Sequence, residues 1–411
     1  MIDFIDQPYD QTPVGQRLMF VAQSDNYTEF GFKYVFYVPD LDAYFYIQPN
    51  PSGVGMFDLA PIIRDTLKHV KLANQVGVEA ESESVFRLKQ MLCYEGWLVN
   101  GVFTINDEVK PASTDGMYFW LANYEVTDGY KPNPRVRYGL CEEYNNYMLS
   151  ERYHETHTWV DANKHMTNIH ADVFIPTQDI SWGIMYTHEM NSPLNYCGSD
   201  VYVEVRDIDD GLVSMATFTL TNDGGQNVDA FGIYPENLRA AGVDLTDWHY
   251  YKVYLIGEGG PFSKTYVFYK VDTPCDTPTI RLQWANTVGG VDYFDFTRSK
   301  ELSYDYERKR YQKVIGTYAD SSFTFNTYDR GVTERPVVAT KGLQINSNWI
   351  SAGEFTLLQT LILSNDVYIV QTDGSQIPVV VEDTSYICRD ERAGRLWNLS
   401  LKLRYSQAVG L

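Results

Sequence analysis

The sequence lacks any run of about 18 apolar residues, the length that a helix needs to cross a bilayer. The N-terminal stretch MIDFIDQPYD also lacks the basic segment and the apolar core of a signal peptide. We therefore expect neither membrane insertion nor a signal peptide.

Cysteine is scarce, and no two cysteines form a CxxC pair. The five cysteines are scattered along the chain: Cys93, Cys141, Cys197, Cys275 and Cys388. Scattered thiols in odd number are typical of a protein that assembles in a reducing cytoplasm, where disulfides are rare. We expect free and mostly buried cysteines.

Basic side chains are few relative to acidic ones. There are 33 Lys and Arg against 54 Asp and Glu, which gives a net charge of −21. Sequence-independent nucleic-acid binding needs a basic surface that displaces counterions, and anionic membranes attract the same kind of surface. The charge therefore argues against both partners and favours solubility at high local concentration.

Catalytic signatures are also missing. The sequence contains no GxSxG element, no Walker A loop and no GxGxxG element after a predicted strand. A glycosidase needs two carboxylates at a suitable separation, and no motif selects such a pair among the many acidic residues. We therefore predict no enzyme and no cofactor, with a glycoside hydrolase as the least favoured alternative. Exposed tyrosines and tryptophans could form a sugar platform, so a carbohydrate-binding protein stays a second alternative.

Four histidines fall within a short stretch and are the candidate metal ligands: His154, His157, His165 and His170. His154 and His157 are three residues apart, whereas the HExxH pattern places its histidines one helical turn apart around a glutamate. On a strand, residues three apart point to opposite faces. The spacing therefore favours surface or hydrogen-bonded core histidines over a metal site.

An acidic run at residues 207–211 resembles a calcium loop at first sight. Asp207, Asp209 and Asp210 precede Gly211. An EF-hand needs ligands at positions one, three and five, a glycine at six and a glutamate at twelve. In this run the glycine comes one position early and no glutamate closes the loop, so the pattern predicts a β-turn.

Aromatic residues, by contrast, are abundant: they make up 15% of the chain and include 32 tyrosines. Tyrosine favours strands and wet interfaces, because its ring is apolar and its hydroxyl is not. In residues 17–48, apolar and polar residues alternate between turn signals, and similar runs recur along the chain. The sequence therefore predicts a mainly β protein with a multi-domain β-sandwich architecture.

Linker signals divide the chain into three predicted domains. Residues 1–130 form an N-terminal β-sandwich-like domain, which ends before the Lys-Pro-Asn-Pro at 131–134. Residues 131–298 form a central domain that resembles a β-sandwich or a jelly roll. Residues 299–313 are charged and rich in tyrosine, and we expect them to bridge into the third domain, residues 299–411.

The third domain contains the clearest predicted helix. Ser351 is a good N-cap and Glu354 lies three residues later, which makes a capping box. Phe355, Leu358 and Ile362 then share one helical face. Alternating apolar residues follow, so we expect a C-terminal α+β module with one capped helix on a small antiparallel sheet.

Residues 280–297, IRLQWANTVGGVDYFDFT, predict a β-hairpin with two glycines in its turn. We expect its aromatic residues to close the core of the central domain. The hairpin and the C-terminal module together carry the aromatic residues that are candidates for the core or for an assembly interface: Trp284, Tyr293, Phe294, Phe296, Trp349 and Trp397.

This hairpin and the segment at 343–405, with VYIV, IPVVVEDTSYI and LWNLSLKLRY, resemble virion structural proteins of tailed bacteriophages that infect Bacteroidota. The N-terminal YVFYV and NPSGVGMFDL elements share the resemblance. The C-terminal helix and sheet are also similar to tail-tube and distal-tail modules. These motifs concern packing and turns, and the family pattern implies no catalytic residue.

The resemblance implies a structural component of the virion tail, tail tip, baseplate or collar, assembled in the host cytoplasm. Its partners would be further copies of the chain in a ring-like homo-oligomer and other virion proteins, bound through edge strands or tyrosine-rich faces. The alternative is a receptor-binding or carbohydrate-binding protein of the tail, with a host surface glycan as its partner. No nucleic acid is expected among the partners.

Overall fold

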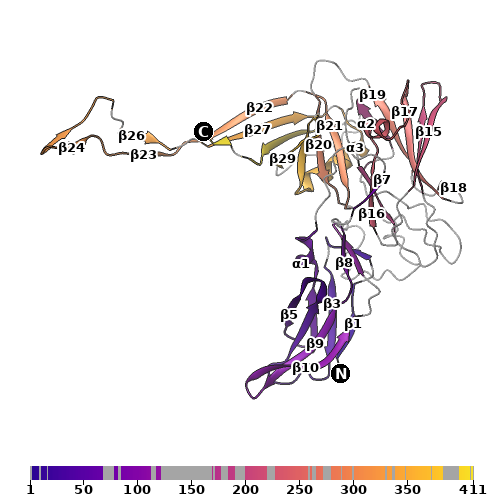
Figure 1. The fold of residues 1–411 in the computed structure, drawn as a ribbon, viewed down its shortest axis with the longest axis vertical. Coiled ribbons are helices and arrows are strands. Elements are labelled where there is room, and N and C mark those ends of the chain that lie inside the picture. Colours follow the sequence, from indigo (N-terminus) through magenta and orange to yellow (C-terminus); the bar gives the residue numbers. More distant parts are fainter. Residues whose placement is uncertain are drawn as a thin grey trace. The chain divides into compact units, whose positions relative to one another are not determined.

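The structure is a computed structural model. It describes residues 2–8, 11–15, 17–67, 78–81, 85–112, 117–121, 169, 172–176, 184–189, 200–219, 227–257, 260–261, 265–271, 279–287, 289–298, 300–328, 331–335, 338–347, 349–371, 373–382, 398–407 and 409–410. The described part is mainly β, with three α-helices and several antiparallel sheets, which confirms the predicted fold class (Figure 1).

The chain divides into two compact units. Unit 1 contains Met1–Asp272 and Ala285–Asp292, and unit 2 contains Thr273–Trp284 and Tyr293–Leu411.

Unit 1 begins with a β-sandwich. One sheet contains β1 (Ile2–Asp6), β3 (Met19–Ser24) and β6 (Val54–Asp58), and the other contains β10 (Val102–Pro111), β9 (Leu92–Val99), β4 (Lys33–Val38) and β5 (Ala43–Ile47). Phe36 of β4 stacks on Phe57 of β6 with the ring centroids 5.2 Å apart, and Phe45 of β5 lies 4.8 Å from the same ring. Both sheets therefore contribute to one buried aromatic core.

A three-stranded sheet and two short helices accompany this sandwich. A further sheet pairs β11 (Met117–Trp120) with β2 (Gln11–Pro13) in parallel and with β8 (Val85–Leu88) antiparallel. The 3₁₀ helix η1 (Pro39–Leu41) and the helix α1 (Ala60–Arg64) both begin at or next to a proline, which is pre-organised for the first helical turn.

The remainder of unit 1 is built on a second pair of sheets. The larger sheet contains β12 (Asp172–Pro176), β19 (Tyr266–Val271), β17 (Tyr250–Gly257), β14 (Asp200–Arg206) and β15 (Leu212–Thr219), and β18 (Gly260–Pro261) pairs with β17. The smaller sheet contains β13 (Ile184–Glu189), β16 (Asn227–Gly232) and β7 (Val78–Glu81). Phe218 of β15 lies 5.1 Å from Phe231 of β16, so the two sheets share core contacts. The short helix α2 (Pro235–Ala240) follows β16 and buries Leu238.

Unit 2 contains most of an eight-stranded sheet and one helix. The strands are β21 (Val291–Phe296), β20 (Ile280–Ala285), β28 (Val367–Val370), β29 (Gln376–Val381), β30 (Ser400–Tyr405), β27 (Val338–Asn346), β22 (Lys300–Glu307) and β31 (Val409–Gly410). The helix α3 (Ala352–Leu363) has the predicted capping box: Ser351 Oγ accepts from the Glu354 N–H, and Glu354 accepts from the Ser351 N–H. The α+β module is present, and its sheet is larger than the sequence suggested.

The hairpin at 280–297 pairs differently from the expectation. It consists of β20 and β21, but β20 pairs with β28 of the C-terminal sheet, in register from Arg281 opposite Val370 to Trp284 opposite Val367. Its aromatic residues therefore belong to the C-terminal sheet. The local sequence does not specify which strand an open strand edge pairs with, because every edge offers the same backbone N–H and C=O groups. Tertiary contacts therefore decide the partner.

Two strand pairings cross the predicted domain boundaries. Strand β7, from the first 130 residues, pairs with β16, and β20, from before residue 298, pairs with β28. The division into three domains stays a prediction. At these two pairings, strands from different predicted domains share a sheet.

A long β-ribbon extends from the sheet of unit 2. After β22, the chain continues through β23 (Arg310–Gln312), β24 (Thr317–Ala319), β25 (Ser322–Thr324) and β26 (Val332–Glu334) before it returns as β27. Strand β22 pairs with β27, β23 with β26, and β24 with β25, all antiparallel. Figure 1 shows the ribbon leading away from the sheet to the β24–β25 turn. We call residues 300–335 the arm.

Candidate functional site

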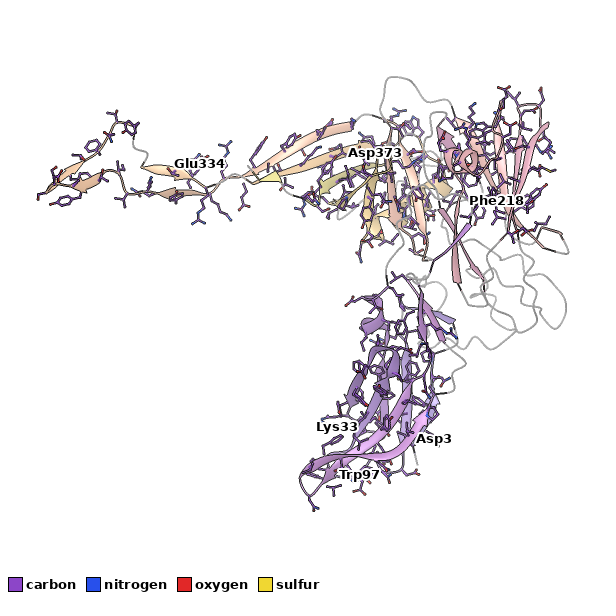
Figure 2. All side chains as sticks on the ribbon, viewed as in Figure 1. Asp3, Lys33, Trp97, Phe218, Glu334 and Asp373 are labelled. Carbon is purple, nitrogen blue, oxygen red and sulfur yellow. The ribbon has the colours of Figure 1, made fainter. Side chains whose placement is uncertain are left out.

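The described residues of the arm are almost all exposed. Every described residue from 300 to 335 is exposed except Gly316, Gly331 and Thr333, which are half-buried. Figure 2 shows the side chains of the arm standing out on both sides of the ribbon around Glu334. A two-stranded ribbon without a covering layer gains little stability from its own packing, because it buries almost no apolar area.

Large apolar side chains line the arm despite this exposure. Eleven of them are between 40% and 85% exposed: Leu302, Tyr304, Tyr306, Tyr311, Val314, Ile315, Tyr318, Phe323, Phe325, Tyr328 and Val332. Scattered single apolar residues are normal on a protein surface, whereas a continuous set on one element marks an interaction site. The arm is therefore the candidate functional site.

At its base, the arm extends the core face of the sheet. Leu302 lies opposite Leu343, and Leu343 lies opposite Leu403, so the three side chains share one face. Leu343 and Leu403 are 3% and 1% exposed, whereas Leu302 is 51% exposed. The buried core of unit 2 thus stops at β27, and the row on β22 continues it without a cover.

The helix α3 lies on the core face of the sheet. Following the register across the sheet, Trp284, Val367 and Val379 lie on the same face as Leu403. Trp284 Nε1 donates a hydrogen bond of 2.9 Å to Thr360 Oγ1 in α3, which places the helix on that face. The apolar row of β22 has the pattern of a core strand, but every residue of β22 is exposed.

Charged side chains accompany the apolar ones. Arg310 Nε lies 3.0 Å from Glu334 Oε1, and Arg308 Nη1 lies 3.4 Å from the other oxygen of the same carboxylate. Lys309 pairs with Glu307 at 2.9 Å, and this contact raises the pKa of the lysine. Because these groups are exposed, such pairs add little stability and remain accessible to a partner's charges.

The geometry of the arm depends on Gly316. Its φ is +85°, a left-handed conformation that residues with a Cβ rarely adopt. A Cβ at this position would lie 2.5 Å from the Thr324 carbonyl oxygen and 2.7 Å from the Phe323 ring. Glycine therefore allows the two strands to approach closely just before the β24–β25 hairpin.

The predicted bridge at 299–313 is therefore the first half of the arm. Sequence reasoning missed the arm as a site, although a signal was present. Leu302, Tyr304 and Tyr306 alternate with charged and polar residues, which is typical of a half-buried strand. The pattern indicates the strand, but it does not show that the apolar face of this strand is exposed.

The candidate aromatic residues occupy different environments. Trp284, Tyr293 and Phe296 are at most 3% exposed and lie in the core. Phe294 is half-buried and packs edge-on against Phe296, with ring centroids 5.1 Å apart. Trp349 is 61% exposed. Trp397 lies outside the described residues.

The hairpin turn is stabilised by its own polar groups. The Asn286 N–H donates to the Gly290 carbonyl at 3.0 Å, and Asn286 Oδ1 accepts from the Gly290 N–H at 2.8 Å. Gly289 has a φ of +99°, as the two glycines of the turn suggested. The turn is thus a structural feature.

The four candidate metal ligands, His154, His157, His165 and His170, lie outside the described residues. Within the described residues, no group of three or more His, Cys, Asp or Glu side chains is placed to hold a metal ion.

The predicted turn at 207–211 is confirmed. Asp207 Oδ1 accepts hydrogen bonds from the N–H groups of Asp209 and Gly211, at 2.9 and 2.7 Å. Asp210 has a φ of +64° and accepts a hydrogen bond from Tyr250, which lowers the pKa of Asp210 and raises that of Tyr250 to about 12. The Asp207 carboxylate is therefore engaged in the turn itself, and the Asp210 carboxylate is engaged by Tyr250 of β17.

One carboxylate is fully buried in the N-terminal sandwich. Glu95 on β9 accepts from Ser24 Oγ on β3, from Asn26 Nδ2 at 2.8 Å and from Asn106 Nδ2 at 3.0 Å. Both carboxylate oxygens are occupied by neutral donors from the protein. The arrangement links the two sheets of the sandwich and is not that of an acid or base open to a substrate.

None of the described helices has the length and apolar character that crossing a bilayer requires.

Comparisons with known proteins offer little. No protein family and no curated protein matches the sequence. Among solved structures, the match with the full extracellular region of plexin A4, domains 1 to 10, has 8% sequence identity and a TM-score of 0.18. It covers 96% of this chain and 30% of that chain. A TM-score this low carries no argument about fold or function.

Proposed function

We propose that the chain is a structural subunit that works by self-assembly and by docking to neighbouring proteins, as a component of a bacteriophage virion in the tail, tail tip or collar region. The observation that carries the proposal is the arm, with eleven large apolar side chains exposed on a ribbon that has no core of its own. An isolated subunit leaves that area in water, whereas an assembly buries it.

The rest of the molecule is compatible with this role. The N-terminal β-sandwich has a buried core, and the buried Glu95 and the Asp207 turn have structural partners. The virion assignment rests on the resemblance of the hairpin and the C-terminal module to phage structural proteins. We therefore propose a structural role without catalysis, with the virion as the site of action.

Mass spectrometry of purified virions of the phage that encodes the chain tests the proposal. The chain is expected at a copy number comparable with that of the other tail components. Immunogold labelling of intact particles would then give its position along the tail. Absence of the chain from purified virions, or presence only in trace amounts, would remove the proposal.

A second candidate function is glycan binding by the N-terminal sandwich. Tyr44 and Tyr46 project from the same face of β5, and each is 50% exposed. Tyr37 stacks on Tyr44 with centroids 4.2 Å apart, and Phe103 meets Tyr46 edge-on at 5.8 Å. Exposed aromatic rings on a flat sheet can stack on the apolar faces of sugars.

A glycan array with the wild type and a Tyr44→Ser, Tyr46→Ser variant tests this alternative. Binding to a host surface glycan that the variant loses would support it. Neither residue is buried, so the variant is expected to fold. A wild type that binds no host glycan would argue against this function.

A further inference from the structure

The distal part of the arm differs in charge from the rest of the chain. Residues 308–335 contain six Lys and Arg but only three Asp and Glu, a net charge of +3. The other 383 residues contain 27 basic and 51 acidic side chains, a net charge of −24. The distal arm, residues 308–335, is thus a short basic segment of a strongly acidic chain.

This basic element is also the most exposed apolar part of the arm. Val314, Phe325 and Tyr328 are 85%, 68% and 78% exposed, and Tyr311 lies between Arg310 and Lys313 in the sequence. A partner that fits this surface offers apolar area together with acidic side chains. Two distal arms are poor partners for each other, because their contact brings like charges together.

We infer that the distal arm of one copy docks on the acidic remainder of a second copy, so that each subunit donates an arm and accepts one. The inference rests on the proposed function and names the partner of the arm. A donor surface that differs from the acceptor surface makes the contact heterologous, and heterologous contacts generate rings or filaments. Charge complementarity steers the encounter, and the aromatic side chains supply the buried area.

Single-stranded nucleic acid also binds basic surfaces with aromatic side chains. The observations favour a second copy instead. Arg308 and Arg310 already face Glu334, and Lys309 faces Glu307, which reduces the positive potential of the arm. The net charge of −21 repels a polyanion as a whole.

The test uses the full chain and an arm-shortened variant, in which an Asn-Gly turn replaces residues 308–334. This variant keeps β22, β27 and the sheet but has no distal arm to donate. Wild type and isotopically labelled variant are mixed at high salt, dialysed to low salt and examined by native mass spectrometry and light scattering.

If the contact is heterologous, the shortened variant alone is monomeric, and in mixtures it accepts the arm of a wild-type subunit and ends the growing assembly. Excess variant therefore reduces the mean size of wild-type assemblies. A variant that stays out of the mixed assemblies would show arm-to-arm contact, and a variant that assembles as well as the wild type would place the interface elsewhere. Either result overturns the inference.

A point substitution checks that the apolar side chains act directly. Phe325→Ser is expected to weaken association by about tenfold or more, as for a residue that contributes strongly to an interface. Phe325→Leu keeps an apolar side chain and is expected to retain most of the association. Equal effects of the two substitutions would contradict a direct contact of Phe325.

The outcomes separate this inference from the proposed function. A wild-type chain that is monomeric at millimolar concentration but abundant in virions overturns the second-copy partner and leaves the virion role standing. A chain that assembles through its arm but is absent from virions does the reverse. Arm-dependent binding of a single-stranded oligonucleotide, without self-association, would assign the arm to nucleic acid and overturn the inference.

Discussion

The indole Nε1 of Trp284 donates a hydrogen bond of 2.9 Å to Thr360 Oγ1, which lies 76 residues later in the chain. Thr360 in turn donates to the Leu357 carbonyl at 2.7 Å. Trp284 is fully buried, so no water can replace this partner. The bond ties β20 to α3 and places the helix over the core face of the sheet.

Replacing Thr360 by valine removes the acceptor while keeping the shape of the side chain. The indole N–H is then buried without a partner, which costs about 1–3 kcal/mol of unfolding free energy. Urea unfolding followed by tryptophan fluorescence measures the loss. Thr360→Ser keeps the hydroxyl and is the control. Equal stability of the valine and serine variants would show that the bond contributes little.

Arg281 and Asp295 form a nearly buried, bidentate ion pair in the β20–β21 hairpin. Arg281 Nε lies 2.8 Å from Asp295 Oδ1 and Nη2 lies 2.7 Å from Oδ2, and the side chains are 7% and 12% exposed. Arg281→Met leaves the carboxylate buried without its cation, which destabilises unit 2 by about 3–5 kcal/mol.

Denaturant unfolding of the full chain measures this effect, and the double variant Arg281→Met, Asp295→Leu provides the comparison. Removing both charges is expected to restore much of the lost stability, because the Asp295 carboxylate is no longer buried without its cation. A double variant that is less stable than Arg281→Met alone would contradict the assignment of the loss to an unpaired carboxylate.

Cys93 is a buried thiol whose ionisation is suppressed. Burial, with a smaller contribution from the nearby Glu95 charge, raises the pKa of Cys93 far above its usual value of 9.0. We expect no alkylation of Cys93 by iodoacetamide at pH 8 in the folded protein and rapid alkylation in urea, since only the thiolate reacts. A variant with serine at the other four cysteines isolates the signal.

The same pKa shift predicts how stability depends on pH. Because the folded pKa is raised, the unfolded chain loses the Cys93 proton first as the pH rises through 9, whereas the folded chain keeps it. The contribution is complete below pH 9 and falls by at most about 1.4 kcal/mol per pH unit above it. Comparing this slope between pH 9 and 10 in the wild type and in Cys93→Ala measures it, and identical slopes would refute it.

Gly316→Ala is expected to disturb the arm while the core stays intact. The new Cβ meets the Thr324 carbonyl and adds strain at a φ of +85°. Hydrogen exchange should speed up in β24 and β25, whereas the urea midpoint of the core stays unchanged. Gly101→Ala is the matched control, because Gly101 has a φ of +81° but open space around its Cβ. Unchanged exchange in the arm would contradict the close approach.

Several features of the fold follow from local sequence. The capping box of Ser351 and Glu354 starts α3 at the expected residue, because N-cap hydrogen bonds involve groups three residues apart. The glycines after Asn286 close the β20–β21 turn for the same local reason. Alternation of apolar residues was sufficient to predict strands and a mainly β fold.

The sequence did not predict which strands pair with each other. The pattern of β20 is the same whether it pairs within the central region or with β28, since edge hydrogen-bonding groups are alike in every strand. The exposure of the arm was not predicted either, because Leu302, Tyr304 and Tyr306 alternate with polar residues in the way of a strand with one buried face.

The sequence by itself thus determined which residues form strands, turns and the capped helix, because those choices depend on neighbours a few residues apart. The tertiary structure alone decided that Leu343 is covered by the core and that Leu302, in register with it, is not. The physical reason is that burial depends on what lies over a face of the sheet, which the local sequence does not specify.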